Sequence, residues 1–296
     1  MKRILVTGKD GQVGWELQRA LAPLGSILSL DRSQLDLADP DSIREVIRGI
    51  SPAIIVNAAA YTAVDKAESE PDLAMRVNAL APGIMAEEAK RLGALLIHYS
   101  TDYVFDGAKS GDYTEEDKPH PLNVYGMSKW EGERAIAQSG CTHLILRTSW
   151  VYSGRGGNFV LTILRLARER DELKVVDDQI GSPTWARALA EATAELLAQN
   201  PRPETCGLYH LSAHGSTSRY HLAQKIIETA RQLSNDGGKW ATLHPIKTAD
   251  YPLPAARPLN SALSNEKIKR AFGIEMESWE NQLAACLNDI ITTRQN

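Results

Sequence analysis

A tyrosine and a lysine four residues apart, in the stretch YGMSK at residues 125–129, could do acid–base chemistry. On a helix, Tyr125 and Lys129 share one face. A free tyrosine titrates near ~10, and a cation beside its oxygen lowers that pKa, so the phenol can donate and recover a proton near neutral pH. The same spacing also fits an ordinary solvated helix face, so other groups must decide between the two interpretations.

A group of polar residues follows an apolar run upstream, in the stretch HYSTDYVFDG. Ser100, Thr101 and Asp102 stand at the end of a predicted strand over 94–100. A hydroxyl group there could bond a substrate carbonyl and polarise it. Thr101 is the favoured candidate and Ser100 the alternative, because strand alternation points the two side chains in opposite directions.

A glycine-rich turn opens the chain, in VTGKDGQVGWEL. Gly8, Gly11 and Gly14 follow a predicted strand and begin a predicted helix, as in a dinucleotide-binding turn, where the helix N-terminus meets a pyrophosphate. The second predicted strand ends in SLDR. Asp31 could bond a ribose, which favours NAD, and Arg32 could meet a 2′-phosphate, which favours NADP, so the choice stays open.

The elements that must position these groups alternate regularly over the first 150 residues. Short apolar runs predict buried strands over 3–7, 26–30, 53–57, 94–100 and 143–148, with helical patterns between them. One of these patterns, over 71–93, carries a Pro-Gly pair at 82–83 that we expect to kink it. The alternation predicts the α/β class, with a Rossmann-like, doubly wound parallel sheet and a ligand crevice beyond the carboxyl ends of its strands.

The second half of the chain is less regular. Helices are predicted over 158–170, 184–200 and 216–233, a strand over 207–212, and either a lid or a surface connection over the Pro-rich region between 239 and 263. We expect a Rossmann domain that binds NAD(P) over 1–150 and a smaller, mainly substrate-binding α/β domain over 151–296. Whether part of the second stretch returns to the first domain stays open.

The composition excludes several classes of protein. With 43% hydrophobic residues and a net charge of −4, the 296-residue chain predicts a globular protein that binds neither nucleic acid nor membrane. The N-terminus shows no signal sequence, and no apolar run reaches the ~18 residues of a membrane span. Cys141, Cys206 and Cys286 lack metal spacing and suggest no disulfide framework, so we expect a cytoplasmic protein.

In combination, TGKDGQVG, NAAAYTAVDKAE, YSTDYVFDG and YGMSK resemble the extended short-chain dehydrogenase/reductase family. The later stretches RTSWVYSGRGGNF, DDQIGSPT and RPLNSAL are similar to its dTDP-4-dehydrorhamnose reductase branch. The resemblance covers nearly the whole chain and implies that NADPH or NADH reduces C4 of dTDP-4-dehydro-L-rhamnose to give dTDP-L-rhamnose. It also implies that Tyr125 donates the proton, that Lys129 orients the ribose and lowers the tyrosine pKa, and that Thr101 binds the reacting oxygen.

The resemblance further implies which residues bind the ligands. Those expected around the cofactor are Gly8, Gly11, Gln12, Val13, Gly14, Asp31, Arg32, Asp36, Leu37, Ala60, Tyr61, Thr62, Tyr99, Tyr125 and Lys129. Those expected around the dTDP-sugar are Thr101, Asp102, Tyr125, Trp150, Gln179, Ser182, Pro183, Arg257 and Asn260. Trp150 could equally be a core aromatic.

One departure concerns a metal. Some members of this branch are thought to pair across a metal held by surface glutamates, and Glu16 and Asp289 match two such positions. The third is Arg187, a cation where a ligand should stand. The sequence therefore makes Mg²⁺ and a metal-bridged pair doubtful, and leaves a homodimer open.

Three rival interpretations remain. A 4,6-dehydratase would need a glutamate where the triplet Thr101-Asp102-Tyr103 has tyrosine. An epimerase would consume no cofactor overall. A non-catalytic regulatory subunit would have little need of Thr101, Tyr125 and Lys129 together.

Overall fold

The apolar runs of the first half of the chain form neighbouring strands of one parallel sheet. In the computed structural model, which describes residues 2–234 and 238–295, the main sheet has the order β10-β5-β4-β3-β1-β2, with every pairing parallel. Its strands are β1 (Arg3–Thr7), β2 (Ser26–Leu30), β3 (Ile54–Asn57), β4 (Leu95–Thr101), β5 (His143–Thr148) and β10 (Gly207–His210). The first and last residues of each strand lie within one residue of the predicted range, except that β10 ends two residues before its predicted end. The order reverses at β1, where a doubly wound sheet opens its ligand crevice.

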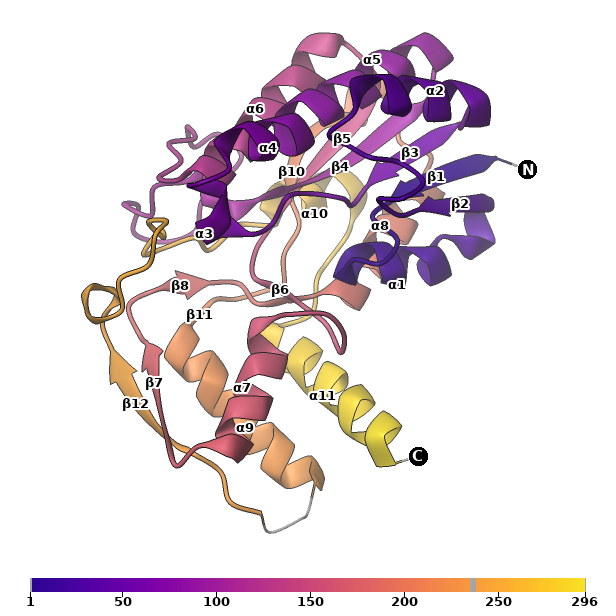
Figure 1. Ribbon diagram of the computed structural model, residues 1–296. Helices are drawn as coiled ribbons and strands as arrows, with labels where there is room; N and C mark the ends of the chain where they lie inside the picture. The colour runs from indigo at the N-terminus through magenta and orange to yellow at the C-terminus, as the bar shows by residue number, and fades with distance from the viewer. Residues whose placement is uncertain (1, 235–237, 296) are drawn as a thin grey trace.

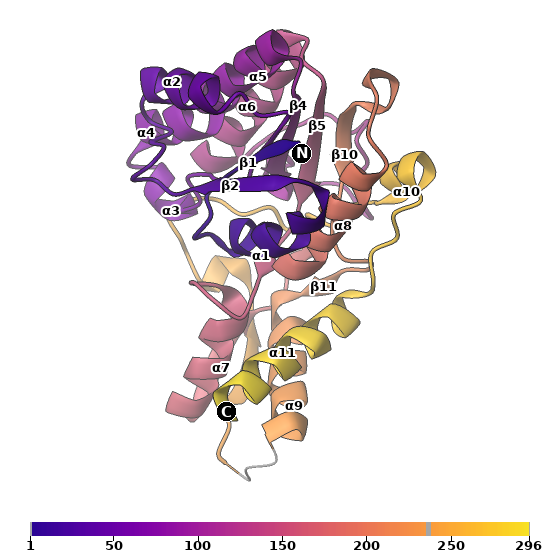
Figure 2. The same ribbon diagram turned by 90° about the vertical axis from the view of Figure 1, so that its right-hand side faces the viewer.

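Helices cover both faces of the sheet, which explains why its strands are apolar throughout (Figure 2). On one face lie α1 (Gln12–Ala20) and α8 (Ala186–Ala198); on the other lie α2 (Pro40–Ile50), α5 (Ala81–Leu92) and α6 (Val124–Ser139). Helix α2 shows how the sequence sets these elements: the Asp39 side chain caps the first turn, and Ile43 and Ile47, four apart, enter the core. The predicted doubly wound α/β class is confirmed.

The predicted helix over 71–93 is one run with an irregularity one turn earlier than expected. It begins as α4 (Pro71–Met75), widens into a π-helical turn at Arg76–Leu80 and continues as α5. Pro82, in the first turn of α5, has no N–H to donate to the carbonyl one turn back. The widened turn directly before it accommodates that missing bond.

The second layer of the molecule lies beyond the carboxyl ends of the sheet (Figure 1). It consists of α7 (Phe159–Glu169), α9 (Arg219–Ser234) and α11 (Trp279–Gln295), packed with the parallel pair β7 (Glu172–Val176) and β12 (Thr242–Ile246). A separate apolar cluster that includes Val160, Ile226 and Leu287 holds these elements together. Strand β12 lies inside the Pro-rich region that we expected to be irregular.

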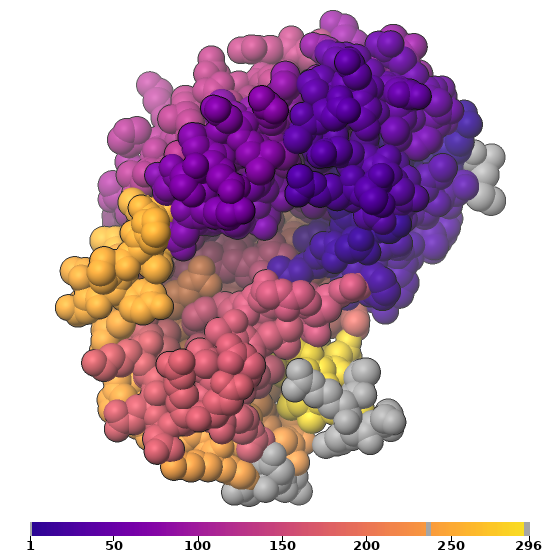
Figure 3. Space-filling view, in the orientation of Figure 1, coloured from indigo at the N-terminus to yellow at the C-terminus, as the bar shows by residue number. Residues whose placement is uncertain are grey.

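The chain passes between the two layers more than once. After β7 it returns through α8 and β10 to the main sheet, and α10 (Glu266–Phe272) packs near β10. Short pairs, β6 (Val151–Tyr152) with β9 (Thr184–Trp185) and β8 (Ile180–Gly181) with β11 (Thr217–Ser218), join the layers. The surface is hollowed between the layers (Figure 3). Across the described residues, every helix is too short or too polar to span a bilayer.

Candidate active site

The glycine turn between β1 and α1 is built by close backbone approach. Gly8 has φ 72°, a conformation that side chains disfavour, and a Cβ there would lie 2.9 Å from the Cα of Ala59. A Cβ on Gly14 would lie 2.0 Å from the carbonyl oxygen of Gly8, so only glycine lets α1 begin directly on the turn. The N-terminus of α1 therefore faces the crevice with its N–H groups, the arrangement that binds phosphate.

A groove beside this turn has the lining expected for the adenosine end of a dinucleotide. Its residues come from the ends of β1, β2 and β3 and from the helical run after them. They are Thr7, Gly8, Leu30, Asp31, Arg32, Leu35, Asp36, Leu37, Ala59, Ala60, Tyr61, Leu73 and Val77. Gly8, Asp31, Arg32, Asp36, Leu37, Ala60 and Tyr61 had been predicted, whereas Thr62 is exposed outside this lining. The mixture of apolar walls and two acids with one arginine fits an adenine and its ribose.

Asp31 is neutralised within the groove by a residue of the glycine turn. The ammonium of Lys9 lies 2.8 Å from its carboxylate, and Ser33 donates a further hydrogen bond of 2.6 Å. These contacts, chiefly that of Lys9, hold the pKa of Asp31 well below its usual range. Arg32 is exposed beside them, 3.9 Å from Asp36. The negative charge that would repel a 2′-phosphate is thus balanced, and the exposed guanidinium of Arg32 lies close by.

Thr101 and Tyr125 meet at the carboxyl end of β4. The hydroxyl of Thr101 donates to Oδ1 of Asp102 over 3.0 Å and accepts from the N–H of Tyr103. It also lies close enough to the Tyr125 phenol to influence the pKa of that group. Tyr125 stands in the first turn of α6. Asn123 caps the N-terminus of this helix, because its side chain accepts a hydrogen bond of 2.8 Å from the N–H of Gly126. A hydroxyl and a phenol therefore lie beside one another at the carboxyl end of β4, where a reacting carbonyl would need both.

The pKa of Tyr125 differs from the expectation. Burial raises it, and the charge of Asp102 adds to that effect, whereas contact with Thr101 lowers it. The predicted lowering by Lys129 is absent because Nζ of Lys129 bonds the carbonyl oxygen of Tyr99 at 2.7 Å and lies 3.1 Å from Nε2 of His98, away from the phenol. Lys129 is itself buried, which lowers its pKa to about 8. Tyr125 is consequently a protonated phenol at neutral pH.

Asp102 lies buried behind the reacting groups. It accepts from Ser149 at 2.8 Å as well as from Thr101, and burial raises its pKa. Ser100, on the opposite side of β4 from Thr101, is also buried, and its hydroxyl has no partner among the described residues. A buried unpaired hydroxyl beside the crevice is a group that a bound molecule could satisfy.

Two arginines approach the phenol of Tyr103 on the substrate side. The guanidinium of Arg219 lies 3.5 Å from the ring centre of Trp150, and both Arg219 and Arg257 interact with the Tyr103 side chain. Trp150 has φ 45°, an unusual conformation for a bulky residue and a form of strain that clusters at functional sites. The edge of the Tyr103 ring packs on Tyr125, with centroids 5.6 Å apart. This cluster offers positive charge and an aromatic face next to the reacting groups.

The remaining residues predicted for the substrate have mixed placements. Arg257 makes a two-pronged pair with Asp65, each bond 2.6 Å, which ties its loop to the first layer. The side-chain amide of Asn260 donates hydrogen bonds to the carbonyls of Lys109 and Gly111. This role is structural, because breaking these bonds to bind a substrate would cost free energy. The others lie between the layers: Gln179 bonds Thr248, and Ser182 and Pro183 are buried.

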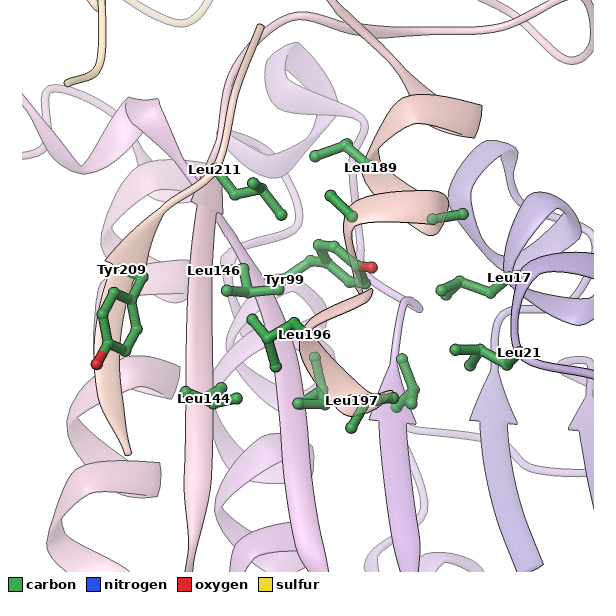
Figure 4. Packing of buried hydrophobic residues seen from close by; sticks show 14 of the residues in the cluster. Leu17, Leu21, Tyr99, Leu144, Leu146, Leu189, Leu196, Leu197, Tyr209 and Leu211 are labelled. Carbon is green, nitrogen blue, oxygen red and sulfur yellow. The ribbon is translucent and has the colours of Figure 1, made fainter. Parts of the chain in front are cut away.

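Three residues expected around the cofactor play different parts. The Tyr99 side chain points away from the crevice into the core against α8, where its hydroxyl bonds Thr193 at 2.6 Å, and only its carbonyl reaches the site (Figure 4). Gln12 accepts from Ser153 and Asn158 and so links the turn to the second layer. Val13 packs against the core under α1. The Tyr99 side chain is held under α8 by its bond to Thr193, so any contact of this residue with the cofactor groove is through its backbone.

The candidate metal position holds a guanidinium instead. Arg187 forms ion pairs with both Glu16, at 3.4 Å, and Asp289. No group of three or more His, Cys, Asp or Glu side chains with metal-binding geometry occurs in the described ranges. A cation between the two carboxylates supplies the charge that a divalent ion would, so these residues do not fit a metal.

Four functional candidates escaped the sequence reasoning. They are Lys9, His98, Tyr103 and Arg219. His98 carried a signal, since it is a polar residue inside the apolar run ALLIHYS and lies on the face opposite Thr101. Arg219 carried none, because it lies in a helix far along the chain and reaches Trp150 only through the fold.

Comparison with known proteins gives a consistent result. A family model described as the RmlD substrate binding domain matches residues 1–292. The chain is 47% identical over 296 residues to the dTDP-4-dehydrorhamnose reductase of Burkholderia thailandensis, covering 98% of this chain and 99% of the relative. It is 48% identical over 298 residues to that of Escherichia coli K12, covering 98% of each.

Solved structures agree. The chain matches, with a TM-score of 0.90 and 37% identity, a dTDP-4-dehydrorhamnose reductase from Bacillus anthracis crystallised in complex with NADP, covering 97% of this chain and 99% of the other. A Thermus thermophilus UDP-glucose 4-epimerase in complex with NAD matches with a TM-score of 0.80 at 19% identity, covering 98% and 99% of the two chains. The second likeness bears on the fold alone.

Proposed function

Since the chain belongs to the dTDP-4-dehydrorhamnose reductase family, within the extended short-chain dehydrogenases/reductases, we propose that Thr101, Tyr125 and Lys129 carry its reaction. The protein is an NAD(P)H-dependent oxidoreductase that reduces the C4 ketone of dTDP-4-dehydro-L-rhamnose to dTDP-L-rhamnose. One observation carries the assignment of roles: a hydroxyl and a protonated phenol converge beside a glycine turn built for a dinucleotide.

The residues of the chain divide the work as follows. Thr101 turns its hydroxyl hydrogen from Asp102 to the ketone oxygen and polarises the carbonyl, while Ser149 still bonds Asp102. Tyr125 then gives its proton to the oxygen as negative charge develops there. Burial keeps the pKa of Tyr125 high, so the phenol holds its proton at neutral pH until the oxygen becomes more basic than the phenolate.

The cofactor site fits a nicotinamide dinucleotide. When bound, the reduced nicotinamide supplies the hydride for C4. The N-terminus of α1 binds the pyrophosphate, the groove beside Asp31 and Arg32 takes the adenosine, and Lys129 bonds the ribose near the reacting carbon. The unpaired hydroxyl of Ser100 and the close-fitting glycines support this fit.

The substrate binds across the two layers. Trp150 and Tyr103 offer flat faces to the sugar, and the guanidinium groups of Arg219 and Arg257 attract the diphosphate. Arg257 must share its fork between Asp65 and the substrate, so Arg219 is the more available cation.

The chemistry of the site argues against elimination. A dehydratase needs a further acid/base carboxylate beside Asp102, and the chain has the Tyr103 phenol there, engaged with two guanidinium groups. Reduction needs only the one proton that Tyr125 supplies.

We place the protein in the cytoplasm and propose a homodimer. Cys141, Cys206 and Cys286 are all free thiols, as a reducing compartment permits. Met75, Leu80 and Met127 are exposed hydrophobic side chains on the packed elements α4, the π-helical turn and α6, where a second copy could cover them. Light scattering at micromolar concentration tests the dimer, and a monomer mass would refute it.

A spectrophotometric assay tests the reaction. Mixed with dTDP-4-dehydro-L-rhamnose and NADPH or NADH, the protein should oxidise one equivalent of cofactor per sugar. A sugar isomerised without loss of nicotinamide absorbance would indicate an epimerase instead.

A further inference from the structure

A buried chain of hydrogen bonds crosses three neighbouring strands and ends at Lys129. Thr7, Asn57 and His98 are partners in register on β1, β3 and β4, and all are buried. Thr7 donates to Oδ1 of Asn57 over 2.7 Å, Nδ2 of Asn57 lies 3.0 Å from Nδ1 of His98, and Nε2 of His98 lies 3.1 Å from Nζ of Lys129. The chain runs along the carboxyl edge of the sheet, beneath the crevice.

The donors along this chain determine which ring nitrogen of His98 carries hydrogen. Oδ1 of Asn57 faces two donors, the Thr7 hydroxyl and the N–H of Ala59 at 3.3 Å, so the amide nitrogen must face His98. An amide nitrogen only donates, and Nδ1 of His98 must therefore accept. Burial lowers the pKa of His98 well below its usual range, so the ring is neutral and its single hydrogen sits on Nε2.

This tautomer aims an N–H at Lys129. An ammonium has no lone pair with which to accept it, whereas a neutral amine accepts it and still donates to the Tyr99 carbonyl at 2.7 Å. We propose that His98 is a positioning residue that holds Lys129 as the neutral amine in the cofactor-free protein and sets the pH at which this lysine gains its proton. The proposal deepens the function above, on which it rests.

Protonation of Lys129 requires the chain to rearrange. The ammonium presents a donor to Nε2, so the ring must carry its hydrogen on Nδ1 instead, and the Asn57 amide must turn its oxygen toward it. One proton is added overall, to Nζ, and the ring stays neutral. The rearrangement removes the acceptor of the Thr7 hydroxyl and leaves the N–H of Ala59 with only its contact of 3.4 Å to Thr7 Oγ1, and both losses oppose the charged lysine.

The charged groups around Lys129 largely offset one another, so His98 determines the balance between the ammonium and the neutral amine. Glu133, on α6, favours the ammonium, but Arg147 of β5 pairs with it at 2.6 Å and offsets its field. Tyr125 is a neutral phenol, and β1 and β3 contribute only Thr7 and Asn57. The lowered pKa of Lys129 agrees with a neutral form that is easily reached.

Nitrogen NMR on the wild-type protein without cofactor tests the tautomer directly. With ¹⁵N-labelled histidine, the ring of His98 should show hydrogen on Nε2 and a bare Nδ1 at pH 9. Hydrogen on Nδ1 at that pH would overturn the proposal. This measurement needs no variant and no sugar substrate.

A variant tests the effect on Lys129. NADPH affinity is followed by fluorescence from pH 6 to 10 in a Tyr125→Phe background, which removes the phenol titration. Affinity should fall as pH rises through the Lys129 pKa, because the ammonium is the form that holds the ribose. His98→Gln presents a carbonyl to the ammonium and should move this fall upward by about one to two pH units.

His210→Gln is the matched control. His210 is an equally buried strand histidine that bonds the Tyr113 carbonyl and makes no contact with Lys129. It should lower stability without moving the pH midpoint. A midpoint unchanged in His98→Gln, or moved as far by His210→Gln, would overturn the proposal. NADPH binding is readable whether or not the dTDP-sugar is reduced, so failure here is distinct from failure of the proposed function.

Discussion

The hydroxyl of Thr101 donates to Oδ1 of Asp102 over 3.0 Å, and this leaves Thr101 no second hydrogen for the Tyr125 phenol. Burial raises the pKa of Tyr125, so the phenol carries its proton before substrate arrives. When substrate binds, the ketone oxygen takes the place of Oδ1 as the acceptor for Thr101.

Replacing Thr101 by valine removes the hydrogen that polarises the ketone. We expect kcat to fall about 100-fold or more, the usual effect of losing one oxyanion donor, with NADPH affinity unchanged. Thr101→Ser should keep most of the activity because it keeps the hydroxyl. Equal losses in the two variants would mean that Thr101 serves packing only.

Cofactor preference should depend on Arg32. Because Lys9 neutralises Asp31, the exposed Arg32 is left to meet a 2′-phosphate. Arg32→Ala should raise KM for NADPH about tenfold, the scale of one charged hydrogen bond, and leave KM for NADH nearly unchanged. Arg44→Ala, which removes a half-buried arginine on α2 outside the groove lining, serves as control. Parallel changes for the two cofactors would contradict this role.

Arg219 should govern substrate affinity. Arg219→Leu keeps part of the apolar contact with Trp150 and removes the charge near the diphosphate. KM for the dTDP-sugar should rise about tenfold or more with little change in NADPH affinity. Arg168, which stacks on Trp240 at 3.7 Å, offers a matched control on a helix of the second layer. If Arg168→Leu raises KM as much, the effect is one of stability.

Chelation should have no effect. Arg187 bridges Glu16 and Asp289, so EDTA should change neither turnover nor oligomeric mass. Arg187→Leu should lower the unfolding free energy by about 1 kcal/mol, as a partly exposed ion-pair cluster warrants. Loss of activity in EDTA that Mg²⁺ restores would overturn this account of the position.

Much of the site could be predicted because its residues stand at places that local chemistry specifies. Gly8 and Gly14 are needed for a turn that admits no Cβ, and Tyr125 and Lys129 lie one helical turn apart. The strands were equally accessible, since strands buried on both faces are continuously apolar.

The features that were missed depend on tertiary contacts. Strand β12 is half-buried and contains a proline, so it looked irregular until β7 paired with it. The phenol of Tyr99 bonds Thr193 of α8 in the core, a contact with a residue far along the chain that the motif around Tyr99 does not predict. Arg219 and His98 gain their roles only from partners far away in sequence, Trp150 and Lys129.

The central claim is that the phenol of Tyr125 supplies the proton in the reduction of the dTDP-keto sugar. Single-turnover oxidation of NADPH, with saturating sugar, measures that step in wild type and in Tyr125→Phe. The account predicts a loss of about 100- to 10,000-fold in the variant, with NADPH binding retained. A variant that oxidises NADPH at the wild-type rate would contradict it.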